Sequence, residues 1–553
     1  MKKLILGASI GNCVHVAGIM HFLNLAEEEG YRTEFLGPAT TIDRLFQAIE
    51  RMKPDIVAIS YRLTPENVVP LLDEIAARRK KLPAGIRWEF GGTKPVADVA
   101  AGYGFFEYVS DGYDDINDSI RYLRGLPRDA SKESYGANLS DRIGASYPYP
   151  ILRHHFGRPS LEETVEGIEK ISKAKVLDVI SLGPDQNAQQ FFFHPEKMRE
   201  EFHGAGGVPI RTPEDFRRLK AASQFGNYPL MRCYSGTEDV FSYAQMLMDT
   251  IDNAWTAVPL CWYNELDGRG TRTLETSMEE AKRLIRWHAE RNVPVEINEP
   301  HHWGLRDAHD VIPVVMAYIS AYNAKKLGVR DYVSQYMFNN PNGLSFSMDL
   351  AKVLAMMEMV ESLQDDHFRV YRETRAGLAL FHADEDVAKG QLAASTFMQM
   401  TVRPHIMHVV GFCEADHAAK PEEVIESCKI VKGVIRHTLS DHFSMEKDAA
   451  ILRRKEELLR EAKVLLDFIG EEYSGVSDPL ADTAVLCECI RKGYIDAVHI
   501  LKNEKYQGNL KTKIVDGKCV PWDDVTGRAL TERERLDSLK KNQRETKKNV
   551  HTA

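Results

Sequence analysis

The sequence predicts an α/β protein in which a doubly wound, Rossmann-like domain precedes a (β/α)8 barrel of the TIM type with a small C-terminal extension. Short apolar runs alternate with amphipathic segments over the first 125 residues, and the alternation resumes on a larger scale further on. At 553 residues, with 43% apolar and 27% charged side chains, the chain is also too long for one ordinary core. We expect four parts: an N-terminal domain over 1–125, a linker over 126–150, a barrel over 151–470, and an extension over 471–553 packed on the barrel.

Five strands are predicted in the N-terminal domain. They are KLILGAS (3–9), TEFLG (33–37), DIVAISY (55–61), IRWEFGG (86–92) and FEYVSDG (106–112). Amphipathic helices between them predict a parallel sheet that is covered on both faces. Ligands of such sheets bind beyond the carboxyl ends of the strands. His15 lies in the loop after the first strand, within GNCVHVAG (11–18).

The barrel is predicted from seven strand-and-helix units that follow the polar, irregular linker. Their strands are KVLDVISLG (175–183), YPLMRCYSG (228–236), WTAVPLCWYN (255–264), VPVEINEP (293–300), DYVSQYMFN (331–339), RVYRETRAG (369–377) and PHIMHVVGF (404–412). Seven units indicate an eight-stranded barrel with one strand unseen. Such barrels carry their chemistry on the loops that follow the strands.

The composition of the chain indicates which classes of binding partner to expect. No window reaches the roughly 18 apolar residues of a membrane span, and the start of the chain lacks a small-residue cleavage site, so we expect a cytoplasmic protein with no membrane partner. A net charge of -10 argues against a nucleic-acid partner. Eight cysteines without a C-x-x-C pair indicate reduced thiols. The expected partner is therefore a small molecule.

The loops of the N-terminal domain carry a specific set of residues. GASIGN lacks the G-x-G-x-x-G of a dinucleotide site, but a histidine follows the first strand, SYRL (60–63) ends the third and a Gly-Gly pair ends the fourth. This set resembles the cobalamin-binding domain shared by methionine synthase, methylmalonyl-CoA mutase and the small subunit of glutamate mutase. The resemblance implies that His15 binds the cobalt of cobalamin, and that the nucleotide tail lies beside Gly18, Ser60, Leu63, Gly91 and Gly92.

One position departs from that family. Its D-x-H-x-x-G loop places an aspartate two residues before the histidine, where this sequence has Cys13. The aspartate holds the second ring nitrogen, and loss of such a partner costs about 10-fold to 100-fold at metal sites. The alternatives are a weaker cobalt bond from His15, a substitute partner such as Asn12, and direct coordination by Cys13, which we rank last.

The barrel resembles the large subunit of glutamate mutase, here fused behind the cobalamin domain. The loops that carry the resemblance are YPLMRCYSGTED for the second strand, CWYNE for the third, VEINEPHHWG for the fourth and CEADH for the seventh. The resemblance implies adenosylcobalamin as cofactor, a small carboxylate as substrate and a homodimer. Radical chemistry belongs to the cofactor, so the barrel has to position the substrate and exclude water.

The same resemblance suggests substrate residues. Arg158 lies near one arginine of the family's substrate clamp, Arg232 lies two residues from another, and Tyr263 matches a substrate tyrosine. Glu414 matches a residue that holds the adenosyl ribose. Because Arg158 precedes the first predicted strand, a salt bridge at the bottom of the barrel is an equal alternative for it. The glutamate that receives the substrate amine is missing from TAVPLC (256–261), so the expected substrate is a related acid or acyl compound rather than glutamate itself.

The stretch NEPHHWG (298–304) adds Glu299, His301 and His302. They are compatible with a general acid/base set, but adjacent histidines seldom bind one metal, and we expect contact with substrate or cofactor. His405 and His408 lie on opposite faces of a strand, so at most one points inward. His417 is expected to be structural.

Three hypotheses follow. The first is an adenosylcobalamin-dependent carbon-skeleton mutase of the glutamate mutase type. The second is a corrinoid-dependent methyltransferase, which usually has a helical cap before its cobalamin domain, whereas here a strand begins at residue 3. The third is a non-catalytic cobalamin carrier or sensor.

Overall fold

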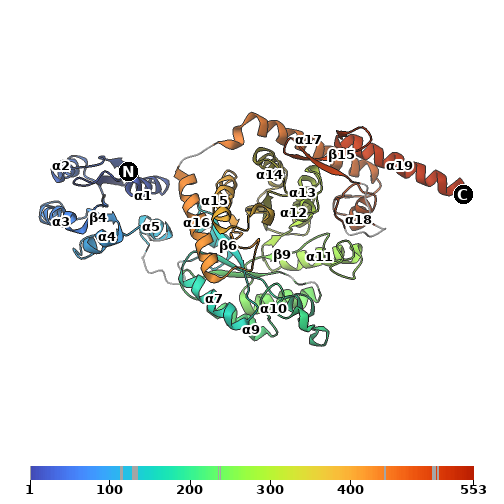
Figure 1. Cartoon of the computed structure of the whole chain (residues 1–553), viewed down its shortest axis with the longest axis horizontal. Helices are drawn as coiled ribbons and strands as arrows, with labels where there is room; N and C mark the ends of the chain where they lie inside the picture. The colour runs from blue at the N-terminus through green and yellow to red at the C-terminus, as the bar shows by residue number, and fades with distance from the viewer. Residues whose placement is uncertain are drawn as a thin grey trace. The chain divides into compact units, whose positions relative to one another are not determined.

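The computed structural model describes residues 2–112, 116–126, 135–234, 236, 238–440, 444–500, 506 and 510–552. The chain divides into two compact units, Met1–Ser134 and Tyr135–Ala553 (Figure 1). Each unit is described by itself.

The N-terminal unit is a parallel five-stranded sheet in the order β2-β1-β3-β4-β5, as the sequence predicts. Its strands are β1 Leu4–Ser9, β2 Arg32–Phe35, β3 Ile56–Tyr61, β4 Arg87–Gly92 and β5 Tyr108–Ser110. Its helices are α1 Ala17–Glu28, α2 Ile42–Met52, α3 Pro65–Arg79, α4 Lys94–Ala101 and α5 Ile116–Leu123. Every residue of β1 and β3 is buried, because helices cover both faces of the sheet.

The strand register fixes which loops meet at the carboxyl edge. Ser9 of β1 pairs with Ser60 of β3, Ser60 pairs with Gly91 of β4, and Gly91 pairs with Ser110 of β5. These residues form one row across the sheet. The loops after β1, β3 and β4 therefore open from the same edge, where parallel sheets bind ligands.

The second unit is a parallel eight-stranded barrel that is nearly closed. Its sheet order is β8-β7-β6-β13-β12-β11-β10-β9, and the seam between β8 and β9 has a backbone hydrogen bond from Ala254 N–H to the Met231 carbonyl at 2.9 Å. The strands are β6 Ile151–Phe156, β7 Val179–Leu182, β8 Leu230–Cys233, β9 Thr256–Ala257, β10 Val295–Glu296, β11 Asp331–Phe338, β12 Arg369–Ala376 and β13 Ile406–His408.

Helices surround the barrel strands (Figure 1). They are α7 Leu161–Lys173, α8 Gln186–Phe191, α9 Pro213–Ala222, α10 Val240–Ile251, α11 Leu274–Ala289, α12 Glu299–Gly304, α13 Val311–Lys326, α14 Phe346–Glu361, α15 Glu385–Met400 and α16 Pro421–Ser440. The seven predicted barrel strands are confirmed. The fold class predicted from the sequence is therefore correct for both units.

The strand that the sequence did not reveal is the first one, β6, with the sequence ILRHHF. Its inward positions include Arg153 and His155, so it lacks the apolar run by which buried strands are recognised. Two predictions change as a result. Arg158 follows the first strand of the barrel instead of preceding it, so it lies at the carboxyl end. Each barrel loop that the sequence assigned to a strand belongs to the next strand in number: the loop assigned to the second strand, for example, follows the third.

Residues 126–150, predicted as a linker, contain a helix, α6 Leu139–Ser146. Leu139 and Ile143 of α6 pack with Ile151, Val179 and other residues from the amino ends of the barrel strands. The helix therefore belongs to the barrel unit and covers the bottom of the barrel. Residues 127–134 lie outside the described part of the chain.

The C-terminal residues pack on the barrel. Helix α17 Ala449–Glu472 contacts α13 and α14, α18 Thr483–Arg491 contacts α11, and α19 Glu532–Thr552 contacts α17. An antiparallel sheet lies between the last two helices, formed by β14 Thr512–Val515, β15 Lys518–Asp523 and β16 Arg528–Ala529. Glu532 of this extension contacts the barrel, where its carboxylate accepts a hydrogen bond from His309 at 2.8 Å.

All eight cysteines are buried and none forms a disulfide. Within the described residues, every helix is too short or too polar to cross a membrane.

Candidate functional site

His15 lies in the loop between β1 and α1, and its side chain is exposed. The buried thiol of Cys13 lies 3.8 Å from His15 Nδ1, within hydrogen-bonding reach of a sulfur atom. The hydroxyl of Ser9 donates to the Cys13 carbonyl at 2.9 Å and shapes the loop. Cys13 thus takes the position of the family's aspartate beside Nδ1, which leaves Nε2 as the ring nitrogen available to a metal.

Asn12 is not the substitute partner of His15. Its Oδ1 accepts a hydrogen bond from the Tyr61 hydroxyl at 3.1 Å. Cys13 is buried in the core of the unit, so its sulfur is also poorly placed to reach a cobalt outside the loop. Of the three alternatives, the geometry supports His15 as the ligand with a thiol partner.

The other predicted cobalamin residues surround open space at the same edge of the sheet. The buried Ser60 hydroxyl has no hydrogen-bond partner among the described residues. A Cβ atom built on Gly18 or Gly91 would meet nothing within 4 Å, so these positions leave room for a ligand. Gly92 is required for another reason, because a Cβ there would lie 2.8 Å from the Tyr61 carbonyl. Leu63 is half-buried against the core beside this edge. The residues present fit a cobalamin nucleotide tail.

Restoring a carboxylate next to His15 should strengthen cobalt binding. In the Cys13→Asp variant we expect cobalamin to bind about 10-fold to 100-fold more tightly, because a carboxylate is a better acceptor for Nδ1–H than a thiol. Absorbance titration with cobalamin measures the affinity. Cys13→Ser is the size-matched control and should stay within a few-fold of the wild type. Equal affinities for all three proteins would contradict the role of residue 13.

Two buried ion pairs cross the interior of the barrel. Arg153 Nε donates to Glu373 Oε1 at 2.5 Å, and Arg232 Nη1 lies 3.1 Å from Glu296 Oε2. All four residues are at most 1% exposed. Arg153 Nη1 also donates to Ser181 Oγ at 3.0 Å and lies 3.4 Å from His155 Nε2. Glu296 accepts from Trp255 Nε1 and Gln335 Nε2, each at 2.8 Å.

A third inward-facing arginine, Arg375, has no carboxylate partner among the described residues. It lies two positions after Glu373 on β12 and pairs in register with His408 of β13. Within the described part of the chain, its Nε donates to the Ala376 carbonyl at 3.4 Å. Burial lowers the pKa of Arg375, and the charge of Arg153 lowers it further. Three arginines thus face two glutamates on the barrel strands, which leaves the charge of Arg375 as the surplus one among these strand residues. Glu414, in the loop after β13, acts on this charge electrostatically, and no ion pair within 4 Å joins the two among the described residues.

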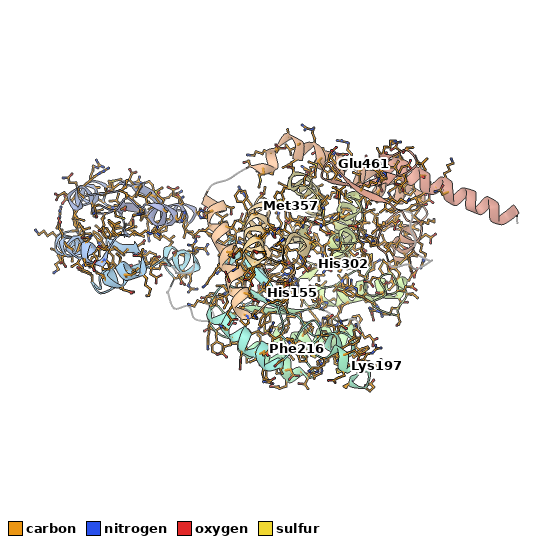
Figure 2. The ribbon with its side chains drawn as sticks, in the orientation of Figure 1. His155, Lys197, Phe216, His302, Met357 and Glu461 are labelled. Carbon is orange, nitrogen blue, oxygen red and sulfur yellow. The ribbon has the colours of Figure 1, made fainter. Side chains whose placement is uncertain are left out.

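Four neutral histidines lie around this charge. The rings of His155 and His408 are 4.8 Å apart, and those of His301 and His302 are 4.4 Å apart. Burial lowers the pKa of each well below its usual value, and the Arg375 charge adds to the effect. Figure 2 shows His155 and His302 in the interior of the barrel unit.

Several of these imidazole nitrogens lack partners. Nδ1 of His301 and both ring nitrogens of His302 and His408 are buried without a hydrogen bond inside the described part of the chain. Buried polar atoms are normally satisfied, so a set of unsatisfied ones at the carboxyl end of a barrel indicates a ligand site. A cation with neutral hydrogen-bonding groups around it suits an anion.

The predicted tyrosine belongs to the same end of the barrel. Tyr263 stacks edge-on against His302 at 6.1 Å, and Arg269 lies 4.5 Å above its ring. Its φ of 64° is unusual for a bulky residue, and Asp267 stabilises the turn by accepting from the Tyr263 and Asn264 amides. The chain holds this ring in an uncommon conformation, which is frequent at functional sites.

Three predicted residues have local structural roles. Both oxygens of Glu299 are used, one by the Leu260 and Cys261 amides and one by Trp303 Nε1, so an acid/base role is not supported. Arg232 is neutralised by Glu296 and stacks on Trp255 at 4.5 Å. The guanidinium of Arg158 donates to the Ala418 carbonyl at 2.8 Å, joining two loops at the carboxyl end of the barrel.

Glu414 lies in the loop after β13. Its Oε1 accepts from the Gly411 amide at 2.6 Å and lies 3.0 Å from His154 Nε2. Burial raises its pKa, but the stronger combined effect of His154, the Gly411 amide and Arg375 leaves the pKa below its usual value. The carboxylate is therefore ionised, and it remains a predicted contact for the cofactor.

Sequence comparison identifies the first unit. Residues 3–110 match the B12-binding domain family. The N-terminal unit is therefore a B12-binding domain, in agreement with the geometry around His15. No curated protein matches the chain.

Two solved structures are weakly similar to the chain. Both are of the cobalamin-dependent S-adenosylmethionine radical enzyme OxsB, one in the apo, selenomethionine-labelled form and one with aqua-cobalamin bound. Sequence identities are 12% and 13% and TM-scores are 0.18 and 0.19. The alignments cover 79% of this chain and 56% of the other, so this chain spans just over half the length of OxsB.

Proposed function

We propose that the protein is an adenosylcobalamin-dependent carbon-skeleton mutase that acts on a small carboxylate without an amino group. The observation that carries the proposal is the surplus charge of Arg375 among neutral, partly unsatisfied histidines at the carboxyl end of the barrel. The B12-binding domain supports the cofactor. The adenosyl form and the mutase reaction rest on the resemblance to glutamate mutase.

The carboxylates near Arg375 argue against an amino acid as substrate. Glu296 and Glu373 are paired with arginines, and the oxygens of Glu299 are used by the backbone and Trp303. Asp267 is bonded to Arg269, at 2.9 Å. Glu414, another carboxylate that acts on Arg375, accepts from the Gly411 amide and lies 3.0 Å from His154 Nε2. Each of these carboxylates already has a partner, so we expect the substrate to be an acid that offers only negative or neutral groups.

Adenosylcobalamin, when bound, supplies an organic radical by homolysis of its cobalt–carbon bond. The chain's own residues bind the cofactor, position the substrate and exclude water. His15 holds the cofactor through Nε2, and the open edge at Ser60 and Gly91 receives its tail. Arg375 binds the substrate carboxylate, while His301 and His302 supply hydrogen bonds to its remaining oxygens. The surrounding buried side chains exclude water from the reacting atoms.

The test uses the full chain with adenosylcobalamin, under anaerobic conditions, and a panel of short dicarboxylic, hydroxy and amino acids. We expect a base-off absorbance spectrum that reverts to base-on in the His15→Ala variant. A mutase gives a paramagnetic resonance signal only with an acid that it turns over, and the dicarboxylic and hydroxy acids should give it. Methyl transfer from methylcobalamin without a radical would support the methyltransferase. Binding with neither reaction would support the carrier.

A further inference from the structure

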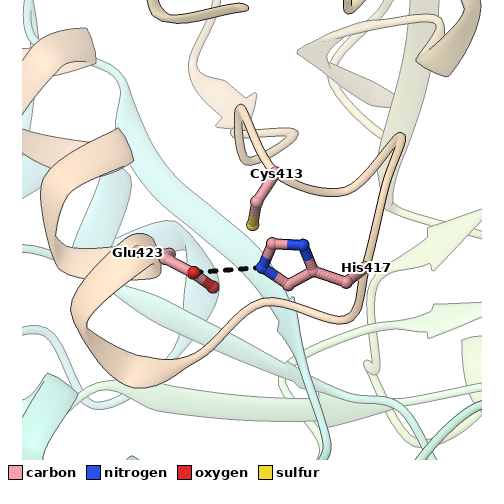
Figure 3. Close-up of side chains that lie close together, drawn as sticks. All are labelled: Cys413, His417 and Glu423. Atoms are coloured by element: carbon pink, nitrogen blue, oxygen red, sulfur yellow. Dashed lines mark hydrogen bonds and ion pairs between the residues drawn. The ribbon is translucent and has the colours of Figure 1, made fainter. Parts of the chain in front are cut away.

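A second cluster of potential ligands lies outside the Arg375 site, in the loop after β13 and the first turn of α16. Cys413, His417 and Glu423 each point one ligand atom into a common space, and these atoms lie within 4.8 Å of one another (Figure 3). His417 Nε2 is 3.0 Å from Glu423 Oε1. The resemblance to known proteins assigned no metal here, and the sequence pattern did not reveal one because the spacing C-x3-H-x5-E is not a common motif.

We propose that Cys413, His417 and Glu423 bind a zinc ion. A thiolate, an imidazole and a carboxylate are the ligand types that zinc takes, with bonds of about 2.0–2.3 Å. Tetrahedral bonds of that length separate ligand atoms by roughly 3.3–3.7 Å, so the three side chains need only small shifts from their present distances. Three protein ligands leave a fourth position for water.

The surroundings of the cluster orient two of its ligands. Asp416 Oδ2 lies 2.9 Å from His417 Nδ1, so the second ring nitrogen is engaged and Nε2 faces the cluster. This is the carboxylate–histidine arrangement that accompanies zinc in proteins. The Lys420 amide donates to Glu423 Oε2 at 2.7 Å, which leaves Oε1 for the metal. The Lys420 ammonium lies 3.9 Å from Oε1 and is the competing cation.

The alternative function for this cluster is catalysis, with Cys413 as a nucleophile instead of a metal ligand. Burial raises the pKa of Cys413 to about 12, and the nearby carboxylates of Glu423 and Glu414 add to the shift. A thiol in such surroundings is a poor nucleophile, because the reactive species is the thiolate. A dipositive ion at the same place would instead stabilise the thiolate, so the anionic surroundings favour the metal.

The position of the cluster suggests what the ion does. The loop residues Cys413 and His417 precede α16, whereas Glu423 lies within its first turn. An ion bound by all three fixes the loop to the helix. Glu414 is the neighbour of Cys413, so the same ion fixes the loop that carries the predicted cofactor contact.

The test uses full-length protein without cobalamin, stripped of metal with a chelator and titrated with Co²⁺. We expect a thiolate-to-cobalt charge-transfer band that saturates at one ion per chain and disappears when Zn²⁺ is added. The Cys413→Ser variant should lose the band. The Asp416→Asn variant retains all three ligands and should bind about 10-fold to 100-fold more weakly.

His194→Ala is the matched control, because His194 belongs to the other cluster of three potential metal ligands in the described residues, with Glu238 and Asp239. Its cobalt spectrum should equal that of the wild type. Absence of the charge-transfer band in the wild type would overturn the proposal, even if Cys413→Ser fails to fold. A band that survives in a folded Cys413→Ser variant would overturn it as well, because another thiol would then be the ligand.

Discussion

Replacing Arg375 by methionine is expected to lower kcat/KM for the acid substrate by about 30-fold to 5,000-fold. Removing one partner of a buried, hydrogen-bonded charge pair costs about 2–5 kcal/mol, and each 1.4 kcal/mol is tenfold. Because the carboxylate stays bound throughout the reaction, most of the loss should appear in KM. The measurement is steady-state turnover with the acid that gives the radical signal in the wild type.

The same substitution should leave the protein as stable as before, or make it more stable. Among the described residues Arg375 has no ion-pair partner and is only partly exposed, so methionine removes a charge that no neighbouring carboxylate pairs with. Lost activity with an unchanged or higher Tm therefore separates a substrate-binding role from a structural one.

A control for Arg375→Met comes from the same strand. Arg369 lies at the opposite end of β12 with a side chain that is 55% exposed, and its nearest carboxylate is Asp331 at 3.8 Å. Arg369→Met should not change kcat/KM. If Arg375→Met also retained full turnover, the substrate carboxylate would have to bind elsewhere.

The sequence was sufficient to predict the B12-binding domain because its function depends on local loops. His15, Ser60 and Gly91 each follow a strand that alternation of apolar and polar segments identifies. Their proximity then follows from the parallel topology, since the carboxyl ends of parallel strands share an edge. The contact between Cys13 and His15 is also local, two residues apart, at the position where the family pattern has its aspartate.

The barrel interior was harder to predict because its inward positions are charged. In β12, Tyr371, Glu373 and Arg375 point inward, yet the outward Arg372 is charged as well, so alternation does not show which face is which. The pairing of Arg153 with Glu373 joins residues 220 positions apart, which no local pattern contains. The sequence nevertheless contains a useful indication. A barrel buries the inward side chains of its strands, so several charged residues within one strand indicate ion pairs inside the barrel.

Replacing Glu373 by glutamine should lower the free energy of unfolding of the barrel by about 3–5 kcal/mol. The substitution keeps the shape of the side chain but removes the countercharge of the buried Arg153, whose other hydrogen-bonding neighbours, Ser181 Oγ at 3.0 Å and His155 Nε2 at 3.4 Å, are neutral. Chemical unfolding followed by tryptophan fluorescence measures the effect on the barrel, because five of the six tryptophans, all but Trp88, lie in that unit.

A control for Glu373→Gln lies on the outer face of the same strand. Arg372 pairs with Glu361 at 2.5 Å, but these side chains are 26% and 24% exposed, so water replaces the lost partner in Glu361→Gln and the expected cost is about 1 kcal/mol or less. The double variant Arg153→Met with Glu373→Leu should recover most of the stability lost in Glu373→Gln, because no charge is then left unpaired at this site. Equal losses in Glu373→Gln and Glu361→Gln would mean that water reaches the interior pair, and the surplus charge of Arg375 would then be screened too.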